Sequence, residues 1–125
     1  MEFNVLPIGE ELGKSILASA SDPLNSENDH TGDGSFIAKV IRNVEFYRPR
    51  YLLASAGDTV KIYFLEGKGG LIYSVSRVGY YEDEDDEYNS KYVTQGHYVE
   101  FKTEDDCLIT LTCTSSSNTI VYWLG

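Results

Sequence analysis

The sequence predicts an all-β protein, a single antiparallel β-sandwich that is jelly-roll or immunoglobulin-like in outline, with about seven or eight strands. Three observations favour this class. Short β-branched and aromatic runs recur from residue 36 onward, turn residues separate them about every 8 to 12 residues, and no helical period of useful length appears. We therefore divide the chain into an irregular N-terminal arm and loop, residues 1–35, and a β-sandwich domain, residues 36–125.

The two strands that end the chain show the clearest patterns. Residues 107–113 (CLITLTC) alternate, so Cys107, Ile109, Leu111 and Cys113 are expected to face the core. Residues 119–124 are apolar on both faces. This favours a strand that is covered on both sides, or one that lies against another subunit.

The two cysteines lie on one predicted strand, six positions apart. At a rise of about 3.3 Å per residue, Cys107 and Cys113 are separated by about 20 Å, whereas a disulfide requires Cα atoms within roughly 7 Å. We therefore expect two buried free thiols that pack as small apolar groups.

The remaining segments follow in chain order. In the arm, residues 3–8 and 15–20 are apolar, and residues 21–30 have loop composition. We expect the segment at residues 15–20 to be an edge strand or a docked segment. Such an arm lies over its own domain or over a neighbour. The other strands are expected at residues 36–41 (continuing over 44–47), 51–55, 60–64, 71–78, 92–94 and 98–102.

The length and the net charge limit the number of domains and the kinds of partner that this chain can have. A chain of 125 residues is one domain with a sizeable core. A net charge of −10 argues against nucleic acid and against an anionic membrane surface as partners. The first residues lack a signal-peptide pattern. We therefore expect that the protein works where it is made or is packaged from there, or that it is extracellular if the chain is a processed mature form.

One loop has oxygen ligands at alternate positions. Asp29, Thr31 and Asp33 precede Gly34 and resemble the opening half of a calcium loop, although Val40 stands where such a loop needs its bidentate Glu. The two interpretations are a calcium site completed by other parts of the chain and a solvated turn. Calcium is the one cofactor that the sequence suggests.

Aromatic residues gather around an acidic run at residues 82–87. Planar amphipathic rings beside polar groups suit a protein interface or a sugar-binding face, and tyrosine is also ordinary on strands. We treat the following as candidate binding residues: Tyr80, Tyr81, Tyr88, Tyr92 and Trp123.

No catalytic motif is present in the sequence. The two histidines, His30 and His97, stand in no nucleophile motif, and the glycines at residues 67–70 precede a predicted strand rather than a helix N-terminus. We assign no catalytic residue and expect a non-enzymatic protein.

Three runs, residues 56–62, 79–81 and 98–111, carry a resemblance. Over residues 51–125 they resemble small β-sandwich modules of bacteriophage virion proteins and carbohydrate-binding modules. The resemblance implies a binding or structural role and assigns no role to any single residue.

The resulting hypothesis is a non-enzymatic recognition or assembly module, a phage-type virion structural protein such as a capsid decoration, head fibre or tail module. Its expected partner is protein, either another copy or a capsid or tail neighbour. The alternative is a carbohydrate-binding module that stacks surface tyrosines on a glycan. A small metal-dependent module or enzyme is the third interpretation.

Overall fold

The computed structural model describes residues 2–19, 27–31, 37–42, 49–77, 91–115 and 117–125. These residues form one helix and ten strands, and every strand pair is antiparallel. The fold is an all-β sandwich, as the sequence predicted. Eight of the ten strands lie in residues 36–125, and the other two lie in the N-terminal arm.

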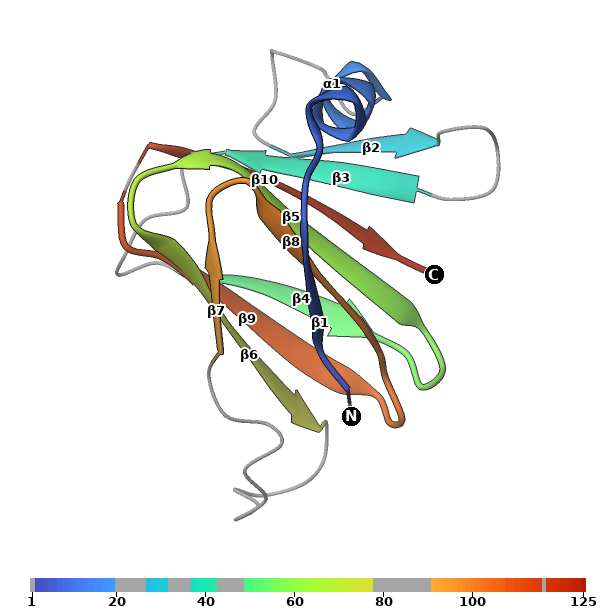
Figure 1. Cartoon of the computed structure of the whole chain (residues 1–125). Helices are drawn as coiled ribbons and strands as arrows, with labels where there is room; N and C mark the ends of the chain where they lie inside the picture. The colour runs from blue at the N-terminus through green and yellow to red at the C-terminus, as the bar shows by residue number, and fades with distance from the viewer. Residues whose placement is uncertain (1, 20–26, 32–36, 43–48, 78–90, 116) are drawn as a thin grey trace.

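Two sheets face each other across the core (Figure 1). The larger sheet has six strands, in the order β1 (Asn4–Pro7), β8 (His97–Lys102), β5 (Thr59–Gly67), β10 (Asn118–Leu124), β3 (Ile37–Arg42) and β2 (Glu27–Thr31). The smaller sheet has four strands, in the order β4 (Arg50–Ala54), β9 (Cys107–Cys113), β6 (Gly70–Arg77) and β7 (Lys91–Thr94).

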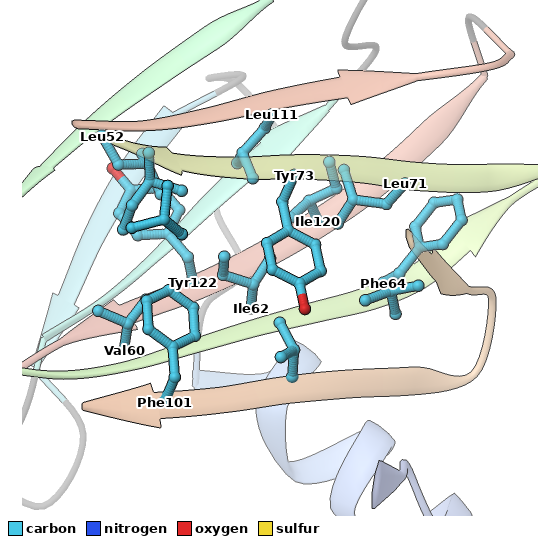
Figure 2. Packing of buried hydrophobic residues seen from close by; sticks show 14 of the residues in the cluster. Leu52, Val60, Ile62, Phe64, Leu71, Tyr73, Phe101, Leu111, Ile120 and Tyr122 are labelled. Atoms are coloured by element: carbon cyan, nitrogen blue, oxygen red, sulfur yellow. The ribbon is translucent and has the colours of Figure 1, made fainter. Parts of the chain in front are cut away.

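The core follows the alternation of the strands. On β5, Val60, Ile62 and Phe64 are fully buried, and on β6 Leu71 and Tyr73 face them from the other sheet (Figure 2). Because side chains on a strand alternate between its faces, each strand contributes every second residue to one continuous apolar layer.

Strand β9 has the predicted pattern. Cys107, Ile109, Leu111 and Cys113 are fully buried, and the residues between them are partly exposed. The thiols are free and stand at the two ends of the strand. The predicted burial and the predicted absence of a disulfide between them are both confirmed.

The position of β10 in the structure explains why it is apolar on both faces. It lies inside the six-stranded sheet between β5 and β3, with Ile120 and Tyr122 in the main core. On its other face Val121 packs against Ile16 of the helix α1 (Glu10–Ser19). Of the two explanations that the sequence left open, coverage on both sides within one chain is the correct one.

The arm contains regular structure that the sequence analysis missed. Residues 10–19 form α1, with Glu10 and Glu11 in the first turn, where the helix dipole favours acids. Of the two alternatives for the apolar segment that starts at residue 15, the edge strand is wrong, and Ile16 docks on the sheet. The helix is short, and docking of Ile16 on the sheet, rather than a strong sequence period, stabilises it. Among the described residues, no helix has the length and apolarity that a membrane crossing requires.

Residues 27–31 form β2, although their composition predicted a loop. The strand forms because it pairs with β3 at the edge of the sheet, and an edge strand tolerates polar residues. The expected continuation of the first sandwich strand over residues 44–47 lies outside the described residues.

Candidate functional site

An open groove of about 750 Å³ runs along the outer side of the six-stranded sheet, where β1, β8 and β5 lie side by side. Register pairs Asn4 with Glu100, Glu100 with Lys61, and Lys102 with Thr59, so these residues share the sheet face that points away from the core. The lining comprises Glu2, Asn4, Gly57, Thr59, Glu100, Phe101, Lys102, Thr103 and Glu104.

Two turns, one after β4 and one after β8, contribute Gly57, Thr103 and Glu104 to the lining of the groove. The Gly57 amide donates to the Thr103 carbonyl at 2.8 Å, and the Thr103 amide donates to the Asp58 carbonyl at 2.9 Å. The Ala56 amide donates to the Asp106 carboxylate at 2.9 Å. Because both turns are tied to each other, the groove is preformed, as small-molecule sites usually are.

The N-terminal segment forms the opposite wall. Strand β1 pairs with β8 over four residues, from Asn4 with Glu100 to Pro7 with His97. The Phe3 ring turns inward, with its centroid 4.8 Å from that of Phe101 and 5.9 Å from that of Tyr73. This apolar anchor places Glu2 and Asn4 at the rim of the groove.

A chain of charge and aromatic contacts runs from Glu100, which lines the groove, to Lys61 and Trp123 nearer the centre of the sheet. Lys61 Nζ lies 3.5 Å from Glu100 Oε1 and 4.8 Å from the centroid of the Trp123 ring. Both ionic side chains are about one third exposed, so the pair is screened by water and contributes little to stability. Its effect is to hold Glu100 in one position on the groove floor.

The interior of the sandwich has different chemistry from the groove. On β4 to β10, whose side chains are described, the buried positions hold aliphatic and aromatic residues together with Cys107 and Cys113, and Asn118 and Thr119 are the buried polar residues of these strands. Tyr73 is among the buried aromatic residues. Burial raises the pKa of Cys113 to about 11 and that of Tyr73 to about 12. These groups therefore stay protonated near neutral pH and form part of the packed core.

The aromatic residues that were predicted to bind a partner do not lie together in the structure. Tyr92 is exposed on the outer face of the four-stranded sheet, and Trp123 lies on the outer face of the six-stranded sheet. The two residues are on opposite sides of the sandwich and share no site. Tyr80, Tyr81 and Tyr88 lie outside the described residues.

The calcium hypothesis concerns residues that are only partly described. The backbone at Asp29 and Thr31 is extended and paired with Lys39 and Ile37 on β3, so these two positions belong to a strand rather than to a loop. Asp33 lies outside the described residues. Among the residues that are described, no three His, Cys, Asp or Glu side chains cluster as a metal ion would require.

The groove is built from residues that no single stretch of the sequence brings together. The outward positions Glu100 and Lys102 could be read from the alternation of their strand, because Val99 and Phe101 were expected to face inward. Their meeting with Glu2 and Asn4 depends on the pairing of β1 with β8, which no local pattern encodes.

Comparison with known proteins identifies a fold. No protein-family model and no curated protein matches the sequence. Protein NMB1881 from Neisseria meningitidis is similar at 12% identity, covering 90% of this chain and 96% of that chain, with a TM-score of 0.50.

Two structures of HppE are also similar. The Fe(II) form matches at 10% identity over 99% of this chain, with a TM-score of 0.54. The Co(II) form in complex with Tris matches at 12% identity over 96% of this chain, with a TM-score of 0.55. The chain spans only 57% and 63% of those two proteins, and identities this low show the fold alone, a cupin-like jelly roll.

These matches correct the earlier resemblance and the function built on it. The similar solved structures described above are cupin-like jelly rolls and not phage virion modules or carbohydrate-binding modules. The strand pattern that suggested those families is common to many antiparallel sandwiches, because short alternating strands and polar turns follow from the architecture itself.

The iron of HppE prompts a test of the interior of this chain. A non-haem Fe(II) site with open positions for oxygen chemistry uses two imidazoles and one carboxylate as its protein ligands. The core side chains on β4 to β10 are mainly aliphatic, aromatic and thiol groups. His97, in register with Phe64, is the one imidazole on these strands, and among the described residues it forms no group of three His, Cys, Asp or Glu side chains. These residues do not fit such a site, and we derive no step through a metal.

Proposed function

We propose that this cupin-like jelly roll binds a small organic cation in the groove between β1, β8 and β5, and that it does not convert the ligand chemically. The observation that carries the proposal is the lining of the groove. Three carboxylates, Glu2, Glu100 and Glu104, surround a cavity whose volume lies within the range of about 300 to 1,000 Å³ that is typical of small-ligand sites.

Charge favours a cation at this position. Lys102 is the one basic residue in the lining, and Lys61 beside the groove is already paired with Glu100. The net charge of −10 adds a field that attracts cations and repels anions. Asn4 and Thr59 add hydrogen-bonding groups to the lining, which suits an amine or guanidinium that carries several N–H donors.

A binding role rather than a catalytic one is supported by the interior. The buried titratable groups on β4 to β10 include Tyr73 and Cys113, whose raised pKa values keep both groups protonated at neutral pH. A protonated thiol is a weak nucleophile and a protonated phenol is a weak base. Both groups therefore suit a packing role.

The test is calorimetric titration with spermidine and with arginine amide, and with citrate as an anionic control. We expect saturable binding of the two cations and none of citrate. Glu104→Gln should weaken cation binding about three- to fivefold, since a partly exposed charge contact is worth about 1 kcal/mol or less. Glu100→Gln should weaken binding further, because Lys61 then loses its counter-charge beside the site.

A matched control separates the groove from general attraction to an acidic protein. Glu66 is exposed on β5 and is not part of the groove lining. Glu66→Gln removes the same charge and should leave the affinity unchanged. If all three variants bind spermidine alike, the cation is held by the overall charge and the proposed groove is not its site.

A further inference from the structure

A row of largely apolar side chains lies next to the proposed cation groove, on the same face of the six-stranded sheet. Register pairs Leu6 of β1 with Tyr98 of β8, and Tyr98 with Tyr63 of β5. Because residues two positions apart on a strand share a face, this row runs beside the row of Asn4 and Glu100, about 7 Å away along the strands. We call the side chains of Leu6, Tyr98 and Tyr63 the apolar row.

The two tyrosines of the apolar row form an ordered aromatic surface. Their ring centroids lie 4.6 Å apart and the ring planes are inclined by 27°, so the rings stack. Burial raises the pKa of Tyr63 to about 12, with further contributions from the neighbouring Tyr98 and from Glu100. The carboxylate of the groove and the aromatic rings are therefore close neighbours, and the Tyr63 phenol is neutral at neutral pH.

The apolar row is covered at its β5 end and open at its β1 end. Ile16 of α1 and Tyr63 pack against the same residue, Val121. Leu6, in contrast, is 39% exposed, and Tyr98 is only partly buried. An apolar group that enters from the groove therefore meets Leu6 and Tyr98.

The carboxylates of the groove by themselves give weak binding. Glu100 is about one third exposed, and an ion pair between exposed groups contributes little because water screens it. Among the described residues of the lining, Phe101 has the one large apolar side chain, and it is buried in the core. Small-ligand sites usually combine apolar walls with a few polar groups that orient the ligand. A ligand that binds firmly here therefore needs apolar surface beside the groove.

The apolar row supplies that surface. The other aromatic ring near Glu100 on this face is that of Trp123, and the ammonium of Lys61 already lies 4.8 Å from its centroid. Leu6 and Tyr98 remain open to a ligand whose charged end is held by Glu100. The arrangement of one charged and one apolar region side by side matches a ligand with the same two parts.

We propose that the cation of this groove is an arylalkylamine, in which a short carbon chain joins an ammonium to an aromatic ring. The inference rests on the proposed function, since it names the class of cation that the groove takes. The ammonium binds at Glu100 and the ring lies on Leu6 and Tyr98. A short alkyl chain, together with the hydrogen bond to the carboxylate, spans the separation of about 7 Å between the two rows. A ring suits the place better than an alkyl group, because aromatic pairs gain from offset or edge-to-face contacts as well as from burial.

The first test is calorimetric titration of the full chain with ligands that differ in one feature at a time. Phenethylamine carries both parts, diglycolamine replaces the ring by a polar tail, and phenethyl alcohol replaces the ammonium by a hydroxyl group. Phenethylamine should bind about tenfold more tightly than diglycolamine, because its ring leaves water on Leu6 and Tyr98. Phenethyl alcohol should give no measurable binding. Saturating spermidine should raise the apparent dissociation constant of phenethylamine, since both ligands use Glu100.

A matched pair of variants locates the ring. Leu6 and Leu12 are 39% and 40% exposed, so Leu6→Asn and Leu12→Asn make the same change at equally exposed leucines. Leu6→Asn should reduce the preference for phenethylamine over diglycolamine from about tenfold to about twofold, whereas Leu12→Asn should leave it at about tenfold. The ratio of the two affinities cancels any general damage to the groove. Tyr98→Leu is a second variant that leaves β1 unaltered, and it should also reduce the preference, to about threefold.

The outcomes separate this inference from the proposed function. Equal affinities for phenethylamine and diglycolamine, with spermidine still bound, would overturn the arylalkylamine and leave the groove as a general cation site. A preference that Leu6→Asn and Leu12→Asn reduce equally would remove the ring from the apolar row. If neither spermidine nor phenethylamine binds, the proposed function is wrong, and the inference is wrong with it.

Discussion

Gly67 shows how one residue without a side chain can determine a turn. It ends β5 with φ of 149°, a conformation that residues with a Cβ rarely adopt. A Cβ at this position would stand 2.6 Å from the ring of Phe64, which is fully buried. The turn between β5 and β6 therefore requires glycine for both its backbone and its space.

Gly67→Ala should lower the free energy of unfolding by about 2 to 3 kcal/mol, because backbone strain and displacement of a core ring add together. Urea denaturation measures this loss. Gly96→Ala is the control, since Gly96 also has a positive φ of 84° but an added Cβ would meet nothing within 4 Å. It should cost about 1 kcal/mol. Equal losses would mean that contact with Phe64 contributes nothing.

Strand β1 is the element on which the candidate site most depends. It is exposed along its length, pairs with β8 alone, and is anchored by the ring of Phe3 against Phe101 and Tyr73. The same strand carries Asn4 and leads from Glu2 into the groove. Its local stability therefore controls how well one wall of the site is formed.

Phe3→Ala should loosen β1 and weaken cation binding in the groove. The stability loss should be about 1 to 2 kcal/mol, less than the ~3 to 5 kcal/mol of a fully buried Phe, because Phe3 is only partly buried. Amide hydrogen exchange should speed up in β1 while β9 stays protected. Leu12→Ala, at an exposed position on α1, should change neither the cation affinity nor the hydrogen exchange of β1. Unchanged affinity in Phe3→Ala with a frayed β1 would remove this strand from the site.

At the scale of the whole molecule, the buried titratable groups predict a loss of stability in alkali. Burial raises the pKa of Cys113 from 9.0 to about 11 and that of Tyr73 from 10.0 to about 12. In the unfolded chain both groups release their protons at the lower values. Their contribution is therefore fully present below pH 9 and is lost as the pH rises through the folded-state values.

The thermal unfolding midpoint should fall progressively between about pH 9 and pH 12. Tyr73→Phe should flatten the upper part of this decline, because it removes one of the groups that must ionise on unfolding. Differential scanning calorimetry across that pH range measures both effects. A midpoint that stays constant or rises from pH 9 to pH 12 would show that these groups titrate alike in the two states.

The sequence by itself determined the sandwich, most of its strands and the state of its thiols. These properties depend on alternation along single strands such as 107–113, and alternation is a local property that burial of one face selects. The tertiary structure decided the rest. Helix α1 and strand β2 exist because of what they pack or pair with, and β10 is apolar on both faces because the core lies on one side and Ile16 on the other. The groove likewise arises only when strands distant in the chain become neighbours, since pairing such as that of Asn4 with Glu100 is a property of the whole fold.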